Sequence, residues 1–244
     1  MKKLVGFFVA VFAAGSASAQ MSASGQAAIG AYRTAITSAE AGQKADAVET
    51  AFTALASVRA ALMGPASTRG TVLESLSDEA FRRVAALPGA IVNREELLLV
   101  EPDPSYYVKL AAAHGDTGDR AFFAALKATY PESVWPVYVD QQTDLGGCTR
   151  FGSGALVETY RRWSAFQQTF PARYVAAARK EVDEVATQLT ESNCACGDAA
   201  SVQDELQRFV AAFRTARIAA KVNQRLQDVR AGRPGIRTGC TASQ

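Results

Sequence analysis

Apolar residues recur at intervals of three and four along most of the chain, which is the spacing of one face of an α-helix. Sustained alternation of apolar and polar residues, the pattern of a half-buried strand, is absent. Alanine is abundant throughout, and it is also the strongest helix former. The pattern therefore predicts an all-α protein, an elongated bundle of about six or seven helices.

Turn residues divide the first half of the chain into separate predicted helices. The pattern gives helices over residues 22–41 and 45–63, and a Gly-Pro pair at 64–65 ends the second. The short turn between them predicts an antiparallel hairpin. Thr71 and Glu74 then have the spacing of a capping box, which begins a further helix.

The sequence of residues 89–103 is compatible with two kinds of secondary structure. Asn93 could begin a helix, whereas the apolar residues 97–100 could equally form a short extended run, because the period of so short a segment does not separate the two. Immediately afterwards, Asp103 and Pro104 place an N-cap acceptor before a proline in the first helical position. A helix is therefore predicted to begin at residue 104.

Residues 131–152 interrupt the helical pattern with aromatic residues, prolines and a pair of glycines. Ordered connections of this length are uncommon inside a compact domain and are often functional or specially held. We expect an aromatic loop that crosses the helices and is tied down by Cys148. Trp135, Tyr138 and Gln141 make it a candidate binding site, since this mixture suits contacts to a sugar or a peptide.

Two long helices are predicted for the C-terminal part. The apolar series over 156–189 keeps its phase across Pro171, which indicates one helix kinked at the proline. A new helix capped by Thr169, with Pro171 at its first position, is the alternative. The apolar series over 198–230 predicts a second long helix after a Cys-Ala-Cys turn.

The four cysteines, Cys148, Cys194, Cys196 and Cys240, are expected to form two disulfides. An unbroken last helix of roughly 33 residues would span about 50 Å, and the tail to Cys240 could reach back only about 30 Å. This favours a bond between Cys148 and Cys240. Two alternatives stay open: CxC cysteines can have separate distant partners, and a hairpin at Pro171 would bring Cys148 to the CxC turn.

Residues 1–19 have the pattern of a signal peptide. Two lysines precede an apolar run over 4–14, and small residues surround a cleavage site after Ala19. The run is short for a bilayer span, so we expect cleavage and export to the periplasm or the exterior, with no transmembrane segment afterwards. Residues 20–244 are expected to form a single helical domain.

Charge gives no reason to expect nucleic acid as a partner, because the chain without its first 19 residues holds 24 basic and 24 acidic residues. The distribution is uneven: residues 91–147 hold nine acids and four bases, and residues 198–244 hold eight bases and four acids. If the domain subdivides, we expect the boundary to separate residues 20–130 from residues 131–244.

Candidate chemistry is sparse. Asp140 and Asp144 lie in the aromatic loop and could act as general acid and base, and His114 is the sole histidine of the chain. Cys194 and Cys196 could form a redox pair or a soft-metal site. Nucleotide-binding, zinc-protease, EF-hand and nucleophile-elbow motifs are all absent.

The sequence therefore favours an exported, non-catalytic module that binds a protein or a component of the cell envelope, without a cofactor or a metal. Its oligomeric state is left open. The alternatives are an enzyme that uses the acids of residues 135–151, or a thiol redox or metal protein based on the CxC turn.

Overall fold

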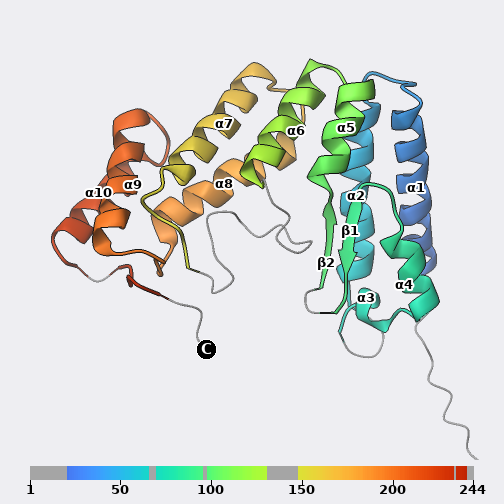
Figure 1. Ribbon diagram of the computed structural model, residues 1–244, viewed down its shortest axis with the longest axis horizontal. Helices are drawn as coiled ribbons and strands as arrows, with labels where there is room; N and C mark the ends of the chain where they lie inside the picture. Colours follow the sequence, from blue (N-terminus) through green and yellow to red (C-terminus); the bar gives the residue numbers. More distant parts are fainter. Residues whose placement is uncertain (1–20, 66–69, 96–97, 131–147, 234, 241–244) are drawn as a thin grey trace, which may run out of the picture.

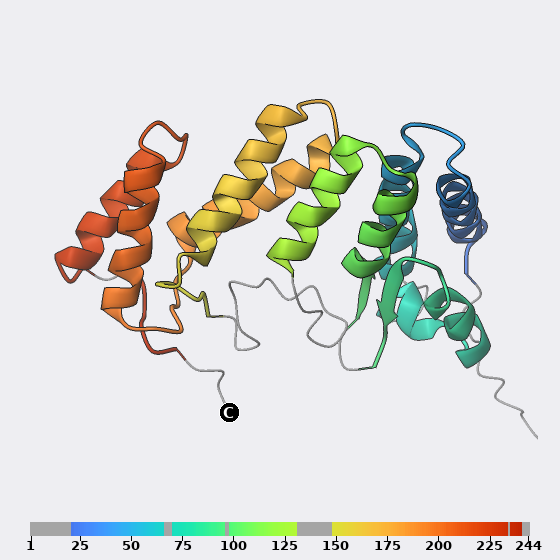
Figure 2. The same cartoon turned by 45° about the horizontal axis from the view of Figure 1, so that its top comes forward.

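The protein is an arched row of helices in the computed structural model, which describes residues 21–65, 70–95, 98–130, 148–233 and 235–240 (Figure 1). Helices pair as α1 with α2, α5 with α6, α7 with α8 and α9 with α10, and a second view shows the same order along the row (Figure 2). The elements are α1 (Ala23–Glu40), α2 (Ala47–Met63), α3 (Val72–Ser75), α4 (Asp78–Ala85), β1 (Ala90–Asn93), β2 (Leu99–Pro102), α5 (Pro104–His114), α6 (Thr117–Thr129), α7 (Ala155–Thr169), α8 (Val175–Glu191), α9 (Ala199–Ala212) and α10 (Ala219–Arg230).

The predicted all-α class is confirmed, but the described residues form ten helices where the sequence indicated about six or seven. Several predicted starts coincide with side-chain caps. Thr71 and Glu74 form the predicted capping box at α3, and the carboxylate of Asp103 accepts a hydrogen bond from the amide of Ser105 at the start of α5. These starts follow from local chemistry, because the caps satisfy amide groups that have no partner within the helix.

The ambiguous stretch forms a small antiparallel hairpin instead of a helix. β1 pairs with β2 so that Ala90 lies opposite Pro102 and Asn93 lies opposite Leu99. The amide of Asp103 also donates to the carbonyl of Gly89 at 2.9 Å, which continues the ladder by one pair. Pro102 has no amide hydrogen to donate and lies at the edge of this two-stranded sheet, where proline is tolerated.

The predicted helix kinked at Pro171 is wrong, because the chain reverses there and forms the antiparallel pair α7 and α8. The alternative, a break at the proline, is correct, although α8 begins at Val175 and not at a Thr169 cap. Tyr174 precedes α8 with a φ of 50°, which is unusual for a residue other than glycine. Its side chain is buried in the core, so tertiary contacts hold this conformation.

The predicted continuous last helix is also wrong. It divides into α9 and α10, joined by residues 213–218, which contain neither glycine nor proline. The reversal lets Val222 of α10 pack in the same buried cluster as Leu206 of α9 and Leu189 of α8. Burial of apolar surface between these helices therefore favours the α9–α10 pair over one continuous helix.

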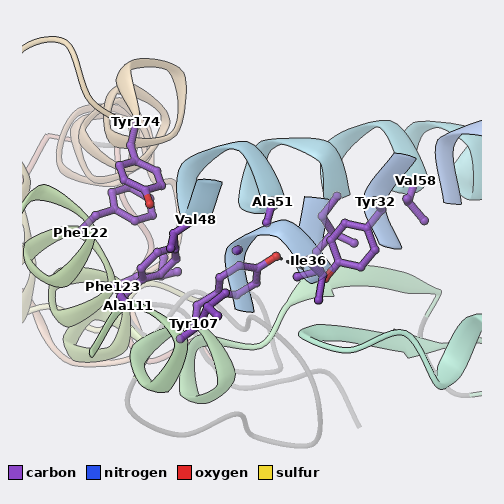
Figure 3. Close-up of a cluster of buried hydrophobic side chains, with 14 of the residues drawn as sticks. Tyr32, Ile36, Val48, Ala51, Val58, Tyr107, Ala111, Phe122, Phe123 and Tyr174 are labelled. Atoms are coloured by element: carbon purple, nitrogen blue, oxygen red, sulfur yellow. Dashed lines mark hydrogen bonds between the residues drawn. The ribbon is translucent and has the colours of Figure 1, made fainter. Parts of the chain in front are cut away.

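The helices share two clusters of buried apolar side chains. The first extends from α1 through α6 to the α7–α8 turn and contains Phe122 and Tyr174, whose stacked rings have centroids 3.8 Å apart (Figure 3). The second lies among the far ends of α7 and α8 and the α9–α10 pair. Trp163 belongs to the first cluster and Leu156 to the second, so one helix contributes to both.

A buried glutamate from α9 caps the start of α7. The N-cap of α7 is Gly154, which has no side chain to accept a hydrogen bond. Glu205 is fully buried; its Oε2 accepts from the amides of Gly152 and Gly154 at 3.0 and 2.6 Å, and its Oε1 accepts from the amide of Val157 at 3.2 Å. Both glycines have positive φ, which brings their amides to one oxygen. The α9–α10 pair is thereby fixed to α7.

The disulfides differ from the favoured prediction. Cys148 bonds to Cys196 and Cys194 bonds to Cys240, with Cα atoms 5.1 and 6.0 Å apart. The alternative in which the CxC cysteines have separate distant partners is therefore correct. Both helical breaks explain this result, because the chain reversals bring Cys148 and the tail to the same end as the CxC turn.

The CxC segment is the middle of three short extended segments. On one side, the amide of Thr149 donates to the carbonyl of Cys194 and the carbonyl of Thr149 accepts from the amide of Cys196. On the other side, the amide of Ala195 donates to the carbonyl of Arg237 at 2.7 Å. Each disulfide thus joins this segment to a different neighbour.

The two disulfides are typical of a protein that folds in an oxidising compartment outside the cytoplasm. Among the described residues, no helix combines the length and the apolar character that a bilayer span requires.

Candidate functional site

A groove between α2 and α8 is the candidate functional site. Its volume is about 1170 Å³, and we call it the α2–α8 groove. Side chains of α2 and β2 form one wall, the side chains of α8 form the other, and the end of α6 contributes to the floor. The apolar floor consists of Phe52, Leu55, Val100, Leu126, Tyr130 and Tyr174.

A hydrogen bond between the two walls closes one end of the groove. At the closed end, the backbone amide of Tyr174 donates to the carboxylate of Glu49 on α2 at 2.6 Å. The lining then continues along α2 to Arg59 and along α8 to Gln188. At 1.5 Å per helical residue, the α8 wall from Ala177 to Gln188 is about 16 Å long.

The wall formed by α8 is one helical face. Most of its lining positions, 177, 180, 181, 184, 187 and 188, are separated by three or four residues or are direct neighbours on that face, and Asp183 lies beside them. Val175 and Ala176 in the first turn complete the lining of α8. The opposite face of α8 places Ala178, Val185 and Leu189 in the protein core. Core packing on one side therefore sets which polar side chains line the groove on the other.

Arg173 holds the closed end of the groove together through a cluster of three carboxylates. Its Nε lies 2.5 Å from Glu49 on α2, and its two terminal nitrogens contact Asp116 and Asp119 at the start of α6, the latter at 2.6 Å. The hydroxyl of Tyr174 also donates to Asp119 at 2.6 Å. The cluster joins α2, α6 and the α7–α8 turn, so it fixes the angle between the walls.

The carboxyl groups of this cluster differ in their environment. Burial raises the pKa of Asp119, although Tyr174, the Asp116 amide and Arg173 act in the opposite direction. For Asp116, partial burial is outweighed by hydrogen bonds from the Asp119 amide and from Arg173, and the pKa lies below its ordinary value. Burial, and then the acceptor Asp119, raise the pKa of the Tyr174 phenol far above its ordinary value.

We expect Asp116→Asn to lower thermal stability at neutral pH by an amount that disappears in acid. The pKa of Asp116 is lower in the folded chain than in the unfolded chain, so its ionised form stabilises the fold above about pH 4. That contribution is lost as the pH falls through the folded-state pKa. Unfolding temperatures of both proteins across a pH series test this. An equal difference in unfolding temperature between the two proteins at neutral and at acid pH would contradict the lowered pKa of Asp116.

Each wall of the more open part of the groove carries one charged pair. Arg59 contacts Glu101 at 2.7 Å on one wall, and Lys180 contacts Glu184 at 3.4 Å on the other. Burial raises the pKa of Glu101, while Arg59 and then Lys180 oppose this effect. Glu181 is buried on the floor side and accepts a hydrogen bond from the hydroxyl of Tyr130 at 2.9 Å.

The loop residues favoured by the sequence lie outside the described residues. This applies to the proposed binding residues Trp135, Tyr138 and Gln141 and to the proposed acids Asp140 and Asp144. Their assigned roles therefore stay predictions.

His114 lies at the exposed end of α5 and does not line the α2–α8 groove. The neighbouring acids Asp116 and Asp119, which could have formed an acid/base pair, instead form the capping box of α6 and bind Arg173. Their geometry is that of a structural cluster, because each accepts a backbone amide of the other.

All four cysteines are disulfide-bonded, so the CxC turn presents no thiol in this oxidised form. Across the described ranges, no group of three or more histidine, cysteine, aspartate or glutamate side chains is placed to hold a metal ion.

Comparison of the chain with protein-family models, with curated proteins and with solved structures finds no match. The geometry of the molecule itself therefore carries the functional argument.

Sequence reasoning missed the α2–α8 groove. Glu101 lies in a stretch that fitted two structures, and Glu181 and Gln188 belong to a helix whose direction depended on the reversal at Pro171. The spacing of polar residues on α8 was visible in the sequence, but nothing local indicated which element would face them.

Proposed function

We propose that this is an exported, non-catalytic binding protein whose α2–α8 groove receives a segment of a partner protein. The observation that carries the proposal is the groove itself, a cavity of about 1170 Å³ with an apolar floor and polar walls. Recognition sites commonly combine an apolar base, which supplies affinity, with a few polar groups that set orientation.

The size of the groove favours a polypeptide over a small molecule. Its volume of about 1170 Å³ lies above the ~300–1000 Å³ typical of small-molecule pockets. Its length of about 16 Å corresponds to about eleven residues of a helix. A cluster of ion pairs fixes the walls at the closed end, so the site is formed before the partner arrives.

Export is part of the proposal. The signal-peptide pattern of residues 1–19 and the two disulfides both fit a periplasmic or secreted location. The partner is then expected among envelope or extracellular proteins.

Ala56→Trp should remove partner binding and leave the fold intact. Ala56 is an exposed residue of α2 in the groove lining, so an indole at this position occupies the groove without entering the core. Ala211→Trp is the matched control, because Ala211 is an exposed helical alanine on α9, away from the groove. The measurement is quantitative capture of envelope proteins by the immobilised oxidised chain and by each variant.

We expect at least about a tenfold loss of specific capture with Ala56→Trp and none with Ala211→Trp. Circular dichroism and the unfolding temperature of each variant check that the fold is retained. Equal capture by both folded variants would refute the groove as the binding site.

A further inference from the structure

The walls of the α2–α8 groove carry more negative than positive groups. Among the described lining residues, two side chains are cationic, Arg59 and Lys180. Five are carboxylates: Glu49, Glu101, Glu181, Asp183 and Glu184.

At least four of these five carboxylates take part in ion pairs, but only two of the pairs have their cation in the lining. Arg59 and Lys180 each neutralise one carboxylate of the lining, Glu101 and Glu184. The arginines that contact Glu49 and Asp183, in contrast, do not belong to the lining. The lining itself therefore presents more carboxylates than cations above an apolar floor, and its remaining cationic partners, Arg173, Arg179 and Arg217, lie outside it.

Gln188, a residue of the α8 wall, also holds a buried acceptor atom. The Oε1 atom of Gln188 is buried and has no hydrogen-bond partner within the described part of the chain. A buried acceptor without a donor is costly, and an occupant that donates a hydrogen bond removes this cost when the Gln188 side chain turns towards the groove. The side chains of lysine and arginine are rich in donors and carry no acceptor.

β2 is a poor site for pairing with a partner strand. The carbonyl of Gly89 bonds to the amide of Asp103, and residues along an antiparallel ladder alternate, so the backbone of Pro102 faces the outer edge. Proline offers no amide hydrogen there. The geometry therefore favours a helix lying in the groove over an added strand.

We infer that the segment bound in the α2–α8 groove is a basic amphipathic helix. This inference rests on the proposed function and specifies the partner's chemistry. Apolar side chains of the helix cover Phe52, Leu55 and Val100, and its lysines or arginines face the acids of the α8 wall. An acidic segment is disfavoured because it brings like charges into a partly desolvated site.

The test uses the full oxidised chain and synthetic amphipathic helical peptides that share the same leucine face. Their polar positions hold lysine, glutamine or glutamate. We expect the leucine–lysine peptide to bind at least about tenfold more tightly than the leucine–glutamate peptide, with the glutamine peptide between them. Its affinity should fall as salt rises, because salt screens exposed charges.

The double variant Asp183→Asn with Glu184→Gln should weaken binding of the leucine–lysine peptide by about tenfold and flatten its salt dependence. The matched control is Glu158→Gln with Asp204→Asn. These acids have similar side-chain exposure, 54 and 47 % against 46 and 40 %, and also take part in ion pairs, but lie on α7 and α9. The control should bind as the parent does.

The charge inference is overturned if the lysine and glutamate peptides bind equally, if none binds, or if the control variant weakens binding as much as the groove variant. Ala56→Trp must also abolish peptide binding. Failure of the peptides alongside groove-dependent capture of a partner would reject only the basic chemistry. Failure of the Ala56→Trp capture test rejects the proposed function itself.

Discussion

Glu205→Ala should lower the free energy of unfolding by about 3–5 kcal/mol. The fully buried carboxylate accepts three backbone amides, those of Gly152, Gly154 and Val157. Without it, these amides lose their acceptor at the start of α7, and each unsatisfied buried donor costs about 1–3 kcal/mol. Urea unfolding followed by far-ultraviolet circular dichroism measures the change.

Glu205→Gln gives a graded control. Its amide oxygen can still accept from Gly152 and Gly154, but its amide nitrogen then faces the donor of Val157. We expect about half the loss seen with alanine. Glu158→Gln changes an exposed acid on α7, the helix that Glu205 caps, and should cost less than about 1 kcal/mol. A Glu205→Ala protein as stable as Glu158→Gln would show that Glu205 does not cap α7.

Reduction of both disulfides should lower the free energy of unfolding by about 8 kcal/mol. The bonds close loops with sequence separations of 48 and 46, and the loss of loop entropy predicts about 4 kcal/mol for each. The two loops share only residues 194–196, so the contributions should be nearly additive. Because the free energy of unfolding of a folded protein is about 5–15 kcal/mol in total, the reduced protein should be only marginally stable.

Two double variants separate the bonds. Cys148→Ala with Cys196→Ala, and Cys194→Ala with Cys240→Ala, should each lose about 4 kcal/mol in urea unfolding. Adding a reductant to either variant should then remove the remaining contribution. Superimposable unfolding curves for the oxidised and reduced parent protein would contradict the stabilisation expected from each disulfide.

The starts of several helices could be predicted because the responsible groups lie next to each other in the sequence. The capping box of Thr71 and Glu74, and the Asp103 cap before Pro104, act within one helical turn. The helical period gave the all-α class for the same reason, since it reflects one buried face of each helix.

The course of the chain was not decided by such local signals. The apolar phase over 156–189 is the same for one kinked helix and for two antiparallel helices, because each half keeps its own buried face. The choice depends on Arg173 and Tyr174, whose partners Glu49 and Asp119 are far away in sequence. The α9–α10 reversal lacks even a proline or a glycine to mark it.

The sequence by itself determined the helical class, the positions of several caps and the expectation of two disulfides. The tertiary structure decided the two reversals, and these decided the disulfide partners and the α2–α8 groove. The physical reason is that caps and periodicity arise from residues within a turn of one another. A groove wall or a disulfide depends on which helices pack together, and burial of apolar surface far apart in the sequence selects that arrangement.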